Sequence, residues 1–155
     1  MSGAAPRGDA ATMRPMRWWD IEQVMGIERD AFAATAWSHA QFWSELAQDN
    51  RTYVVAEDRD GICGYAGVMA VPPTGDIQTI AVATRAQRRG LGRSLLRTLL
   101  DAAQAAGCTE VLLEVRADNT PAIAMYVDAG FESIARRGSY YGPGEDALVM
   151  RRRRP

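Results

Sequence analysis

The sequence predicts a single domain of the mixed α/β class, in which helices flank one sheet. Its 155 residues are enough to enclose a hydrophobic core, and 47% of them are hydrophobic against 24% that are charged. Segments in which apolar residues have helical spacing alternate along the chain with short apolar runs that are typical of strands. No internal repeat and no linker to a second domain interrupts this alternation.

Two helices are expected near the N-terminus. From Asp20 to Phe32 the apolar residues form one stripe of a helix, and the first residue of this range is the expected cap. A second helix is expected to start at Ser38, because Ser38 and Gln41 have the spacing of a capping box. Trp37, directly before this cap, can pack on Phe42 as a hydrophobic staple.

Three strands are expected to follow these helices. The runs Tyr53–Ala56 and Ile62–Val71 flank the turn-forming segment Asp58–Gly61, a pattern that predicts a hairpin. Pro72–Gly75 then breaks the chain, and Ile77–Val82 forms the third strand.

The second half of the sequence alternates helices and strands. Leucines recur at helical spacing from Leu91 until Gly107, which is the expected end of that helix. The run Val111–Val115 is mostly apolar on both faces, as is usual for a strand in a covered sheet. The remaining elements are a helix with Thr120 as cap and Pro121 as first residue, ended by Gly130, and two strands, Phe131–Arg136 and Asp146–Arg151, that flank a loop rich in Gly, Ser and Tyr.

Both ends of the chain are expected to lie outside the folded domain. Residues 1–12 are small or polar and lack the apolar stretch of a secretion signal, so we expect a flexible tail and then one domain over residues 13–151. Residues 152–155 form a basic C-terminal tail within the run Arg151–Pro155, for which a solvated tail is favoured over an RNA-binding arm. No apolar run approaches the length of a membrane span.

Composition excludes several classes of chemistry. All 18 basic residues are arginine, which excludes a Schiff-base lysine and the lysine of a Walker phosphate loop. Cys63 and Cys108 make neither a zinc cluster nor a disulfide framework, and they suit a reducing cytoplasm. The only histidine, His39, lies in an expected surface helix, so we expect no metal site. A net charge of -1 gives no reason to expect DNA binding.

A basic loop with two glycines, Gln87–Gly92, precedes the leucine-rich helix. The first turn of a helix has unpaired N–H groups and the positive end of the helix dipole, so an anion can bind there. Gly90 and Gly92 allow the backbone to approach a diphosphate closely, and Arg88, Arg89 and Arg93 add positive charge. An ordinary solvated turn is the alternative. A dinucleotide fingerprint is disfavoured because its third glycine is missing.

The strand Ile77–Val82, followed by Gln-x-x-Gly-x-Gly and a leucine-rich helix, resembles the acetyl-CoA signature of the GNAT superfamily of N-acetyltransferases. The resemblance extends from Met16 to Met150 and implies a mostly antiparallel, twisted sheet flanked by helices. It is most specific for the RimI type, which acetylates the N-terminal alanine of a small-subunit ribosomal protein. The residues that carry it are Glu28, Phe32, Trp37-Ser38, Leu113-Glu114-Val115-Arg116, Asn119, Ala122, Tyr126, Gly130-Phe131, Arg137, Tyr140-Tyr141, Asp146-Ala147 and Met150.

The resemblance implies an acetyl-CoA-dependent enzyme and assigns roles to particular residues. Glu114 falls on the general base of the family and Tyr126 on its general acid. The backbone at the end of the strand before the loop would meet the pantetheine arm, and one of its N–H groups would meet the oxyanion. The coenzyme contacts implied in this way are Ile80, Ala81, Val82, Arg88, Arg89, Gly90, Leu91, Gly92, Arg93 and Asn119.

Considered without the resemblance, these residues allow other interpretations. Glu114 lies in the middle of an apolar strand, where an unpaired carboxylate is costly, and this favours a functional role. It could instead lie near the strand end and pair with Arg116 or a neighbouring arginine. Tyr126 shares a helical stripe with apolar neighbours, so packing in the core would explain it. Asn119 could simply cap the next helix.

The chemistry fits an N-terminal amine as the acetyl acceptor. A terminal α-amine has a pKa of about 8, whereas a lysine side chain has a pKa of about 10.4. One carboxylate is therefore an adequate base for a terminal amine. By resemblance, Tyr140 and Tyr141 would line the groove for the peptide, along with Trp37 or Phe32. Departures from the subgroup bear on peptide specificity, and they are Ala36, Ser139 and the segment Asp76-Ile77-Gln78.

The predicted function is therefore direct transfer of acetyl from acetyl-CoA to a protein N-terminus within a ternary complex, in the cytoplasm, without an acyl-cysteine, a metal, DNA or a membrane. The oligomeric state is open, and a monomer is compatible with the sequence. A second hypothesis is acetylation of a lysine, a polyamine or an antibiotic amine on the same scaffold. A third is a non-catalytic module that binds acyl-CoA, against which the presence of both Glu114 and Tyr126 argues.

Overall fold

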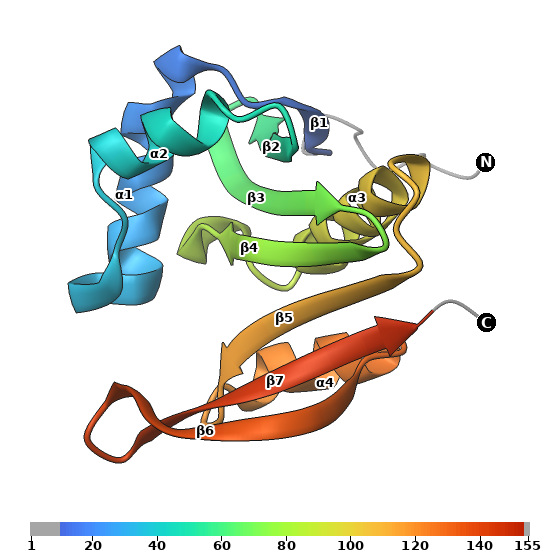
Figure 1. The fold of residues 1–155 in the computed structure, drawn as a ribbon. Helices are drawn as coiled ribbons and strands as arrows, with labels where there is room; N and C mark the ends of the chain where they lie inside the picture. Colours follow the sequence, from blue (N-terminus) through green and yellow to red (C-terminus); the bar gives the residue numbers. More distant parts are fainter. Residues whose placement is uncertain (1–9, 154–155) are drawn as a thin grey trace, which may run out of the picture. The chain divides into compact units, whose positions relative to one another are not determined.

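A computed structural model describes residues 10–153 of the chain and has one mixed, mostly antiparallel sheet with helices on its faces (Figure 1). The predicted fold class is thus confirmed. The seven strands lie in the order β1-β2-β3-β4-β5-β7-β6, and β4 and β5 pair in parallel. Their bounds are β1 (Thr12–Pro15), β2 (Arg51–Asp58), β3 (Gly61–Val71), β4 (Thr74–Val82), β5 (Glu110–Arg116), β6 (Glu132–Gly142) and β7 (Glu145–Arg153).

The helices occur where the apolar periodicity predicts them. Short 3-10 turns precede or follow some of them, and no helix within residues 10–153 is long and apolar enough to cross a membrane. The helices are α1 (Ile21–Phe32), α2 (His39–Leu46), α3 (Leu91–Ala105) and α4 (Thr120–Asp128), and the 3-10 turns are η2 (Trp18–Asp20), η3 (Ala33–Thr35) and η4 (Thr84–Ala86).

The chain divides into two compact units. The N-terminal unit contains the described residues up to Asp49, together with Tyr53–Gly67 and Thr79–Leu96. The C-terminal unit contains Asn50–Thr52, Val68–Gln78 and the described residues from Arg97 onward.

The core of the N-terminal unit forms where the apolar stripe of α1 meets α2 and the first strands. Ile21 and Val24 are fully buried there, with Phe42 of α2 and Tyr65 of β3. The ring of Phe42 packs edge-on against Tyr65, with 5.9 Å between the ring centroids. Because this stripe recurs at helical spacing, α1 lies with one face against the sheet and the other in solvent.

The capping box and the hydrophobic staple of α2 are confirmed. The Ser38 N–H donates to Gln41 Oε1 at 2.7 Å, and the Gln41 N–H donates to Ser38 Oγ at 3.2 Å. The rings of Trp37 and Phe42 lie 5.3 Å apart, so the residue before the cap packs on the first turn of the helix. His39 is exposed on α2, as predicted.

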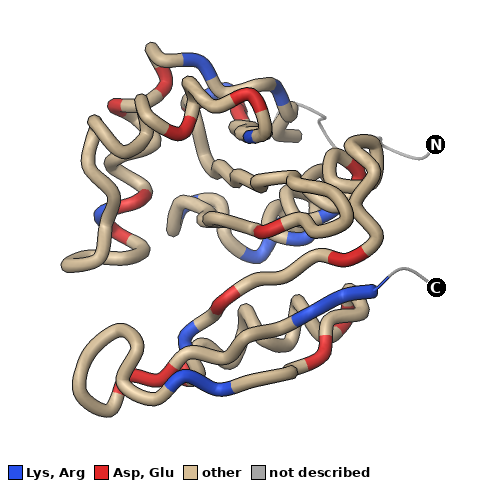
Figure 2. The backbone as a smooth tube through the Cα atoms, in the orientation of Figure 1, with Lys and Arg blue, Asp and Glu red and all other residues tan. Residues whose placement is uncertain are grey.

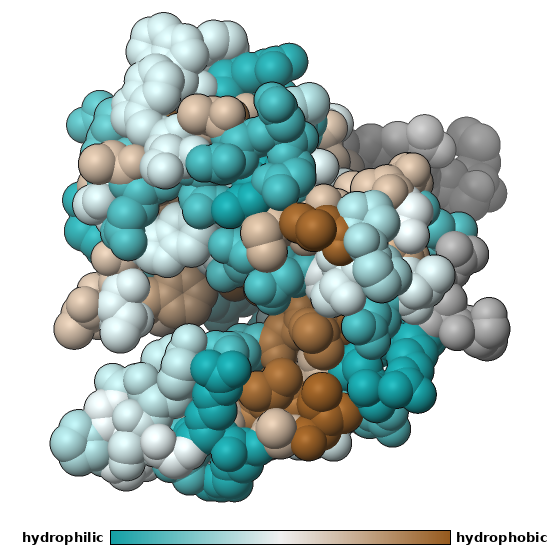
Figure 3. Space-filling view, viewed as in Figure 1, coloured by the Kyte–Doolittle hydropathy of each residue, from teal (hydrophilic) through white to brown (hydrophobic). Residues whose placement is uncertain are grey.

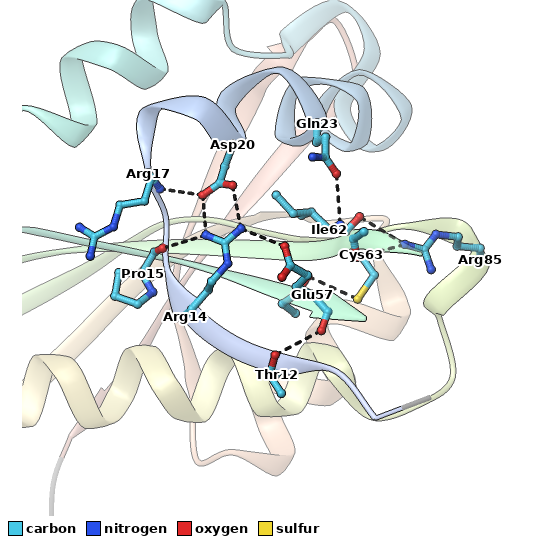
Figure 4. A network of polar contacts seen from close by, with 12 residues as sticks. Thr12, Arg14, Pro15, Arg17, Asp20, Gln23, Glu57, Ile62, Cys63 and Arg85 are labelled. Carbon is cyan, nitrogen blue, oxygen red and sulfur yellow. Dashed lines mark hydrogen bonds and ion pairs between the residues drawn. The ribbon is translucent and has the colours of Figure 1, made fainter. Parts of the chain in front are cut away.

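Asp20 lies at the N-cap of α1, as predicted, but its side chain makes no capping hydrogen bond to this helix. The Asp20 carboxylate instead accepts two hydrogen bonds from the Arg14 guanidinium, each 2.8 Å long, and a third from the Arg17 N–H at 2.7 Å (Figure 4). Arg14 also contacts Glu57 of β2 at 3.0 Å. This network closes the turn η2, which carries the exposed Trp18 and Trp19. The sequence could not show it, because Arg14 lies on a strand that was not predicted.

That strand, β1, corrects the predicted extent of the N-terminal tail. Thr12 pairs with Glu57 of β2, and Pro15 pairs with Val54, so ordered structure begins inside the range 1–12. β1 is only four residues long and is partly exposed, which leaves no clear alternation of apolar and polar residues. Residues 1–9, for which a flexible tail was predicted, lie outside the described residues.

In the C-terminal unit, β5 alternates between a buried and a half-buried face. Leu113 pairs with Met150 of β7 on the buried face, and both side chains are almost fully covered. Glu114 pairs with Val149 on the other face. Apolar side chains gather on a face of this unit, over the strands β5 and β7 (Figure 3).

The predicted C-terminal tail is also shorter than expected. β7 continues to Arg153, so Arg152 and Arg153 belong to the sheet, while residues 154–155 lie outside the described residues. The basic stretch at the end of β7 is visible in Figure 2. Arg152 Nε donates to the carbonyl of Ala129 at 2.9 Å, which attaches the end of α4 to β7. Arg151 lies 3.9 Å from Glu132 of β6.

Tyr140 and Tyr141 lie in a strand and not in the predicted loop. β6 and β7 extend as far as the turn between Gly142 and Glu145, and their pairing is irregular between Arg137 and Gly142. Within this irregular stretch Ser139 has a φ of +53°, in the left-handed region. Such a bulge was not predictable from local pattern, because it depends on the register of the opposite strand.

Candidate active site

The N-terminal unit carries the predicted coenzyme loop between η4 and α3. The backbone is left-handed at Arg88, with a φ of +67°, and again at Gly90, with a φ of +77°. The Gly90 carbonyl accepts the Ser94 N–H at 3.1 Å, so Gly90 is the residue at which the helical hydrogen bonds of α3 begin. Alternating handedness turns successive N–H groups toward one side, which forms a nest for an anion at the start of a helix.

The arginines of this loop differ in their surroundings. Arg88 and Arg93 are exposed. Arg89 is exposed as well, but it lies 3.6 Å from Asp58, whose carboxylate is also contacted by Arg85 at 2.8 Å. These two guanidinium groups lower the pKa of Asp58, with the hydrogen bond from Arg85 as the largest cause. Arg89 therefore also has a structural contact, which the sequence did not indicate.

The end of β4 leads directly into this loop. The Val82 carbonyl accepts a hydrogen bond from Gln87 Nε2 at 3.4 Å, and the Ala83 N–H donates to Cys63 of β3 at 2.8 Å. The Leu91 side chain is buried, so only its backbone is available to a ligand. A ligand that binds to this segment must contact mainly main-chain groups. The predicted contacts of Ile80, Ala81 and Val82 are of that kind.

The C-terminal unit contains Glu114, which is less buried than its place in an apolar strand suggests. The side chain is 29% exposed and lies 3.4 Å from Arg137 of β6, so it is neither deeply buried nor unpaired. The Tyr140 hydroxyl donates a hydrogen bond to Glu114, and this bond is the main reason that the pKa of Tyr140 is raised. Arg116, the partner suggested by the sequence, instead contacts Asp118 at 3.1 Å.

Tyr126 on α4 is held in a packed environment close to the tyrosine pair. Its side chain is buried against Phe131, with 5.8 Å between ring centroids in an edge-on arrangement. Burial, and to a smaller extent the proximity of Tyr141, raises the pKa of Tyr126 to about 12. The phenol therefore keeps its proton at neutral pH. Tyr140 and Tyr141 are themselves in contact, with ring centroids 5.0 Å apart.

Asp76 of β4 is a site residue whose role the sequence did not indicate. β4 and β5 pair from Thr74 with Glu110 to Asp76 with Leu112, and Glu114 follows two residues later on the same face of β5. Burial raises the pKa of Asp76, and the charge of Glu114 raises it further, while Arg51 opposes both effects. A second carboxylate therefore lies close to the predicted base. Only the parallel register, which is non-local, reveals it.

Asn119 and Trp37 both have structural contacts. The Asn119 side chain accepts the Ala122 N–H at 3.3 Å and caps α4, so the predicted capping role of Thr120 is wrong. Trp37 packs on Phe42 and lies 6.4 Å from the ring of Tyr53. Neither observation tests the ligand contact predicted for these two residues.

The described residues bring the candidate groups together in two sets. Within residues 10–153, no group of three or more His, Cys, Asp or Glu side chains is placed to hold a metal ion. The C-terminal unit contains the acid–base candidates, with Asn119. The N-terminal unit contains the coenzyme loop, the end of β4 and Trp37. The acid–base set consists of Glu114, Tyr126, Tyr140, Tyr141, Asp76 and Arg137.

Known proteins resemble the chain over most of its length. The chain is 39% identical over 139 residues to the N-alpha-acetyltransferase RimI of Mycobacterium tuberculosis, covering 86% of each protein. It is 41% identical to an uncharacterized protein of Mycobacterium leprae, of whose length it spans 38%. The crystal structure of the ribosomal-protein-S18-alanine N-acetyltransferase from Escherichia coli superposes with a TM-score of 0.82 at 30% identity, covering 92% of this chain and 93% of that one. Residues 17–131 match the acetyltransferase (GNAT) family, and the chain belongs to this family.

Proposed function

We propose that the chain transfers the acetyl group of acetyl-CoA to the N-terminal α-amine of a protein, with the N-terminal alanine of ribosomal protein bS18 as the substrate. The observation that carries this proposal is the identity, over most of the chain, to enzymes that have this activity by name. These include the bS18-alanine N-acetyltransferases of Salmonella typhimurium, at 34%, and Escherichia coli, at 32%. Such a substrate places the reaction in the cytoplasm.

Glu114 is the proposed general base. The incoming α-amine has a pKa of about 8, so most of it is protonated at neutral pH. It must lose a proton before its nitrogen can attack the thioester carbonyl. A half-exposed carboxylate can accept this proton directly or through a water molecule. The hydrogen bond from Tyr140 and the contact with Arg137 hold the carboxylate in one orientation, which favours a fixed approach of the amine.

Tyr126 is the proposed general acid. When the amine attacks, the new C–N bond forms and the C–S bond breaks, and the departing coenzyme A thiolate takes up a proton. The Tyr126 phenol keeps its proton at neutral pH because its pKa lies at about 12. The packing against Phe131 restricts the ring, so the hydroxyl has a defined direction.

The loop before α3 fits the diphosphate of the coenzyme. Two left-handed residues, Arg88 and Gly90, present N–H groups at the start of a long helix, and a Cβ added at Gly90 would meet no atom within 4 Å. The open side of Gly90 allows a phosphate to approach the backbone. Arg88 and Arg93 are exposed beside it and can pair with further phosphate oxygens.

Transfer is proposed to be direct, without an acetylated cysteine. Cys63 and Cys108 are both buried and both unbonded to another cysteine. Burial raises the pKa of each thiol above its ordinary value, which disfavours the nucleophilic thiolate.

The test is the turnover of Glu114→Gln with acetyl-CoA and a peptide that begins with the N-terminus of bS18. The rate constant kcat is expected to fall at least about 100-fold, because general base catalysis contributes on this order. Glu110→Gln, on the same strand, is the matched control and should retain the wild-type rate. A wild-type protein that releases thiol with lysine peptides or polyamines, but not with the bS18 peptide, would contradict the proposed substrate.

A further inference from the structure

A cluster of polar side chains lies buried in the core of the N-terminal unit. Glu28 of α1 is 1% exposed, Tyr65 of β3 is 0% exposed, and Thr79 of β4 is 8% exposed. We call these three residues the Glu28 cluster. They come from three different elements, and Tyr65 belongs to the apolar core that also contains Ile27 and Ala81. The proposed reaction uses none of them.

Each member of the Glu28 cluster has a buried polar atom that makes no hydrogen bond of normal geometry with a described residue. These atoms are Glu28 Oε2, the Tyr65 hydroxyl oxygen and Thr79 Oγ1. The Tyr65 hydroxyl nevertheless lies close to both of the other side chains, because weak hydrogen bonds with Thr79 and Glu28 and the charge of Glu28 all act on the pKa of Tyr65. Leaving three such atoms unsatisfied in a core is costly. A polar site with three converging partners suits one internal water molecule, which usually makes two to four hydrogen bonds.

Glu28 also holds a piece of main chain outside its own helix. Its carboxylate accepts the N–H of Trp37, the residue before the cap of α2. Trp37 ends the link between α1 and α2, which begins with the turn η3. Thr79, the third member of the cluster, directly precedes Ile80, in the part of β4 that leads to the coenzyme loop.

We propose that Glu28 is a positioning residue for the peptide substrate, which fixes the main chain of Trp37 to β3 and β4 through one internal water held by Tyr65 and Thr79. This inference rests on the proposed function, because Trp37 is assigned to the peptide groove only by resemblance. Glu28 touches neither substrate in this scheme. It acts by holding the α1–α2 link in one conformation.

The positioning depends on the charge of Glu28. The groups that face the carboxylate are the Tyr65 hydroxyl from β3 and the Trp37 N–H, and Tyr65 is faced in turn by Thr79 from β4 and Tyr53 from β2. Tyr53 itself donates to Glu45 of α2 at 3.3 Å. Burial raises the pKa of Glu28 to about 7, against the opposing effects of Tyr65 and Trp37. The ionised carboxylate accepts from Trp37 more strongly than the neutral acid does.

The kinetic test compares Glu28→Gln with wild type between pH 5.5 and pH 8.5. Above pH 7 the variant is expected to raise the KM for the peptide about tenfold, which is what loss of a hydrogen bond to a charged group costs. The KM for acetyl-CoA should not change. Below pH 6 the peptide KM of the two proteins should converge, because wild-type Glu28 is then also neutral. Protonation of the substrate amine affects both proteins equally and cancels in their ratio.

Glu22→Gln, on the exposed face of the same helix, is the matched control and should behave as wild type.

A second pair of variants tests the water site without changing the carboxylate. Thr79→Val removes the hydroxyl and should raise the peptide KM in the same direction, while Thr79→Ser keeps the hydroxyl and should restore it. A ratio of KM values that is independent of pH, or equal effects of Thr79→Val and Thr79→Ser, would overturn the proposal.

Hydrogen exchange provides a readout that needs no activity. The Trp37 amide should exchange at least about tenfold faster in Glu28→Gln than in Glu22→Gln at pH 8, because the stronger acceptor is lost. Unchanged protection of this amide would overturn the role of Glu28 by itself. Absence of peptide acetylation by the wild-type protein would instead contradict the proposed function, so the two failures are distinguishable.

Discussion

At the scale of single residues, Glu114 differs from what its place in the sequence suggests. Its neighbours on β5 are apolar, yet the carboxylate is partly solvated and is contacted by Arg137 and Tyr140 of β6. These partners are more than twenty residues away along the chain, so no local pattern contains them. Burial and the nearby charge of Glu114 raise the pKa of Asp76 on β4. The surroundings of the proposed base are thus built by residues of three strands, β4, β5 and β6.

Tyr126→Phe is expected to lower kcat by about 100-fold, because the departing thiolate loses its proton donor. The acetyl-CoA dissociation constant, measured by calorimetry, should not change, since the ring and its packing on Phe131 remain. Tyr140→Phe serves as the comparison, because it removes a hydroxyl that contacts Glu114 and not the sulfur. If Tyr126→Phe keeps the wild-type kcat, Tyr126 is a core residue only.

At the scale of elements, the irregular end of β6 determines where the tyrosine pair lies. Asp146 of β7 accepts the Ser139 N–H at 2.9 Å and Arg136 Nε at 2.8 Å, which holds the bulge in place. Ser139 is one of the departures from the subgroup, and its backbone is left-handed. Asparagine and glycine adopt this conformation more readily than serine does.

Ser139→Gly is therefore expected to stabilise the protein by about 0.5–1 kcal/mol, because glycine adopts a positive φ without steric cost. Ser133→Gly, at a position of the same strand that pairs with Met150 and has no positive φ, should destabilise it by a similar amount. Urea denaturation of the three proteins measures both changes. Destabilisation by Ser139→Gly would show that the weak contact of Ser139 Oγ with the Gly144 N–H, at 3.4 Å, matters more than the backbone.

The loop before α3 provides a second test at this scale. Gly90→Ala should weaken acetyl-CoA binding by about fivefold or more, since a left-handed conformation costs a residue with a Cβ about 1–2 kcal/mol. No clash contributes, because the added Cβ would meet nothing within 4 Å. Gly26→Ala in α1 is the control, with equally open space but no positive φ. It should leave the dissociation constant unchanged. Equal binding by both variants would contradict the role of the loop.

At the scale of the whole molecule, the stability of the fold depends on pH through two buried acids, Asp20 and Glu28. Their contributions change with pH in opposite directions. Burial alone would raise the pKa of Asp20, but the hydrogen bonds from Arg14 and Arg17 lower it. Its contribution is thus present above the unfolded pKa and is lost as the pH falls through the folded pKa. The contribution of Glu28 is instead lost as the pH rises, because the pKa of Glu28 is raised in the folded protein. The two effects together predict a maximum of stability on the acidic side of neutrality.

For Glu28, the folded protein binds more protons than the unfolded chain between pH 4.5 and about 7. The free energy of unfolding should therefore fall as the pH rises through this window, by up to about 3 kcal/mol for a shift of this size. Glu28→Gln should remove this decline, while Glu22→Gln should keep it. Urea titrations at pH 5 and pH 8 measure the difference. A decline of equal size in Glu28→Gln would show that another group causes it.

The sequence by itself determined the elements whose signals are local. The stripe of α1, the capping box of α2 and the glycine loop before α3 involve contacts within a few residues, so their residue types specify them. Only the tertiary structure decided the pairing of β1, the bulge at Ser139, the partners of Glu114 and the proximity of Asp76. Each of these depends on strand register between distant segments, and register is set by the packing of the whole sheet and not by any local pattern.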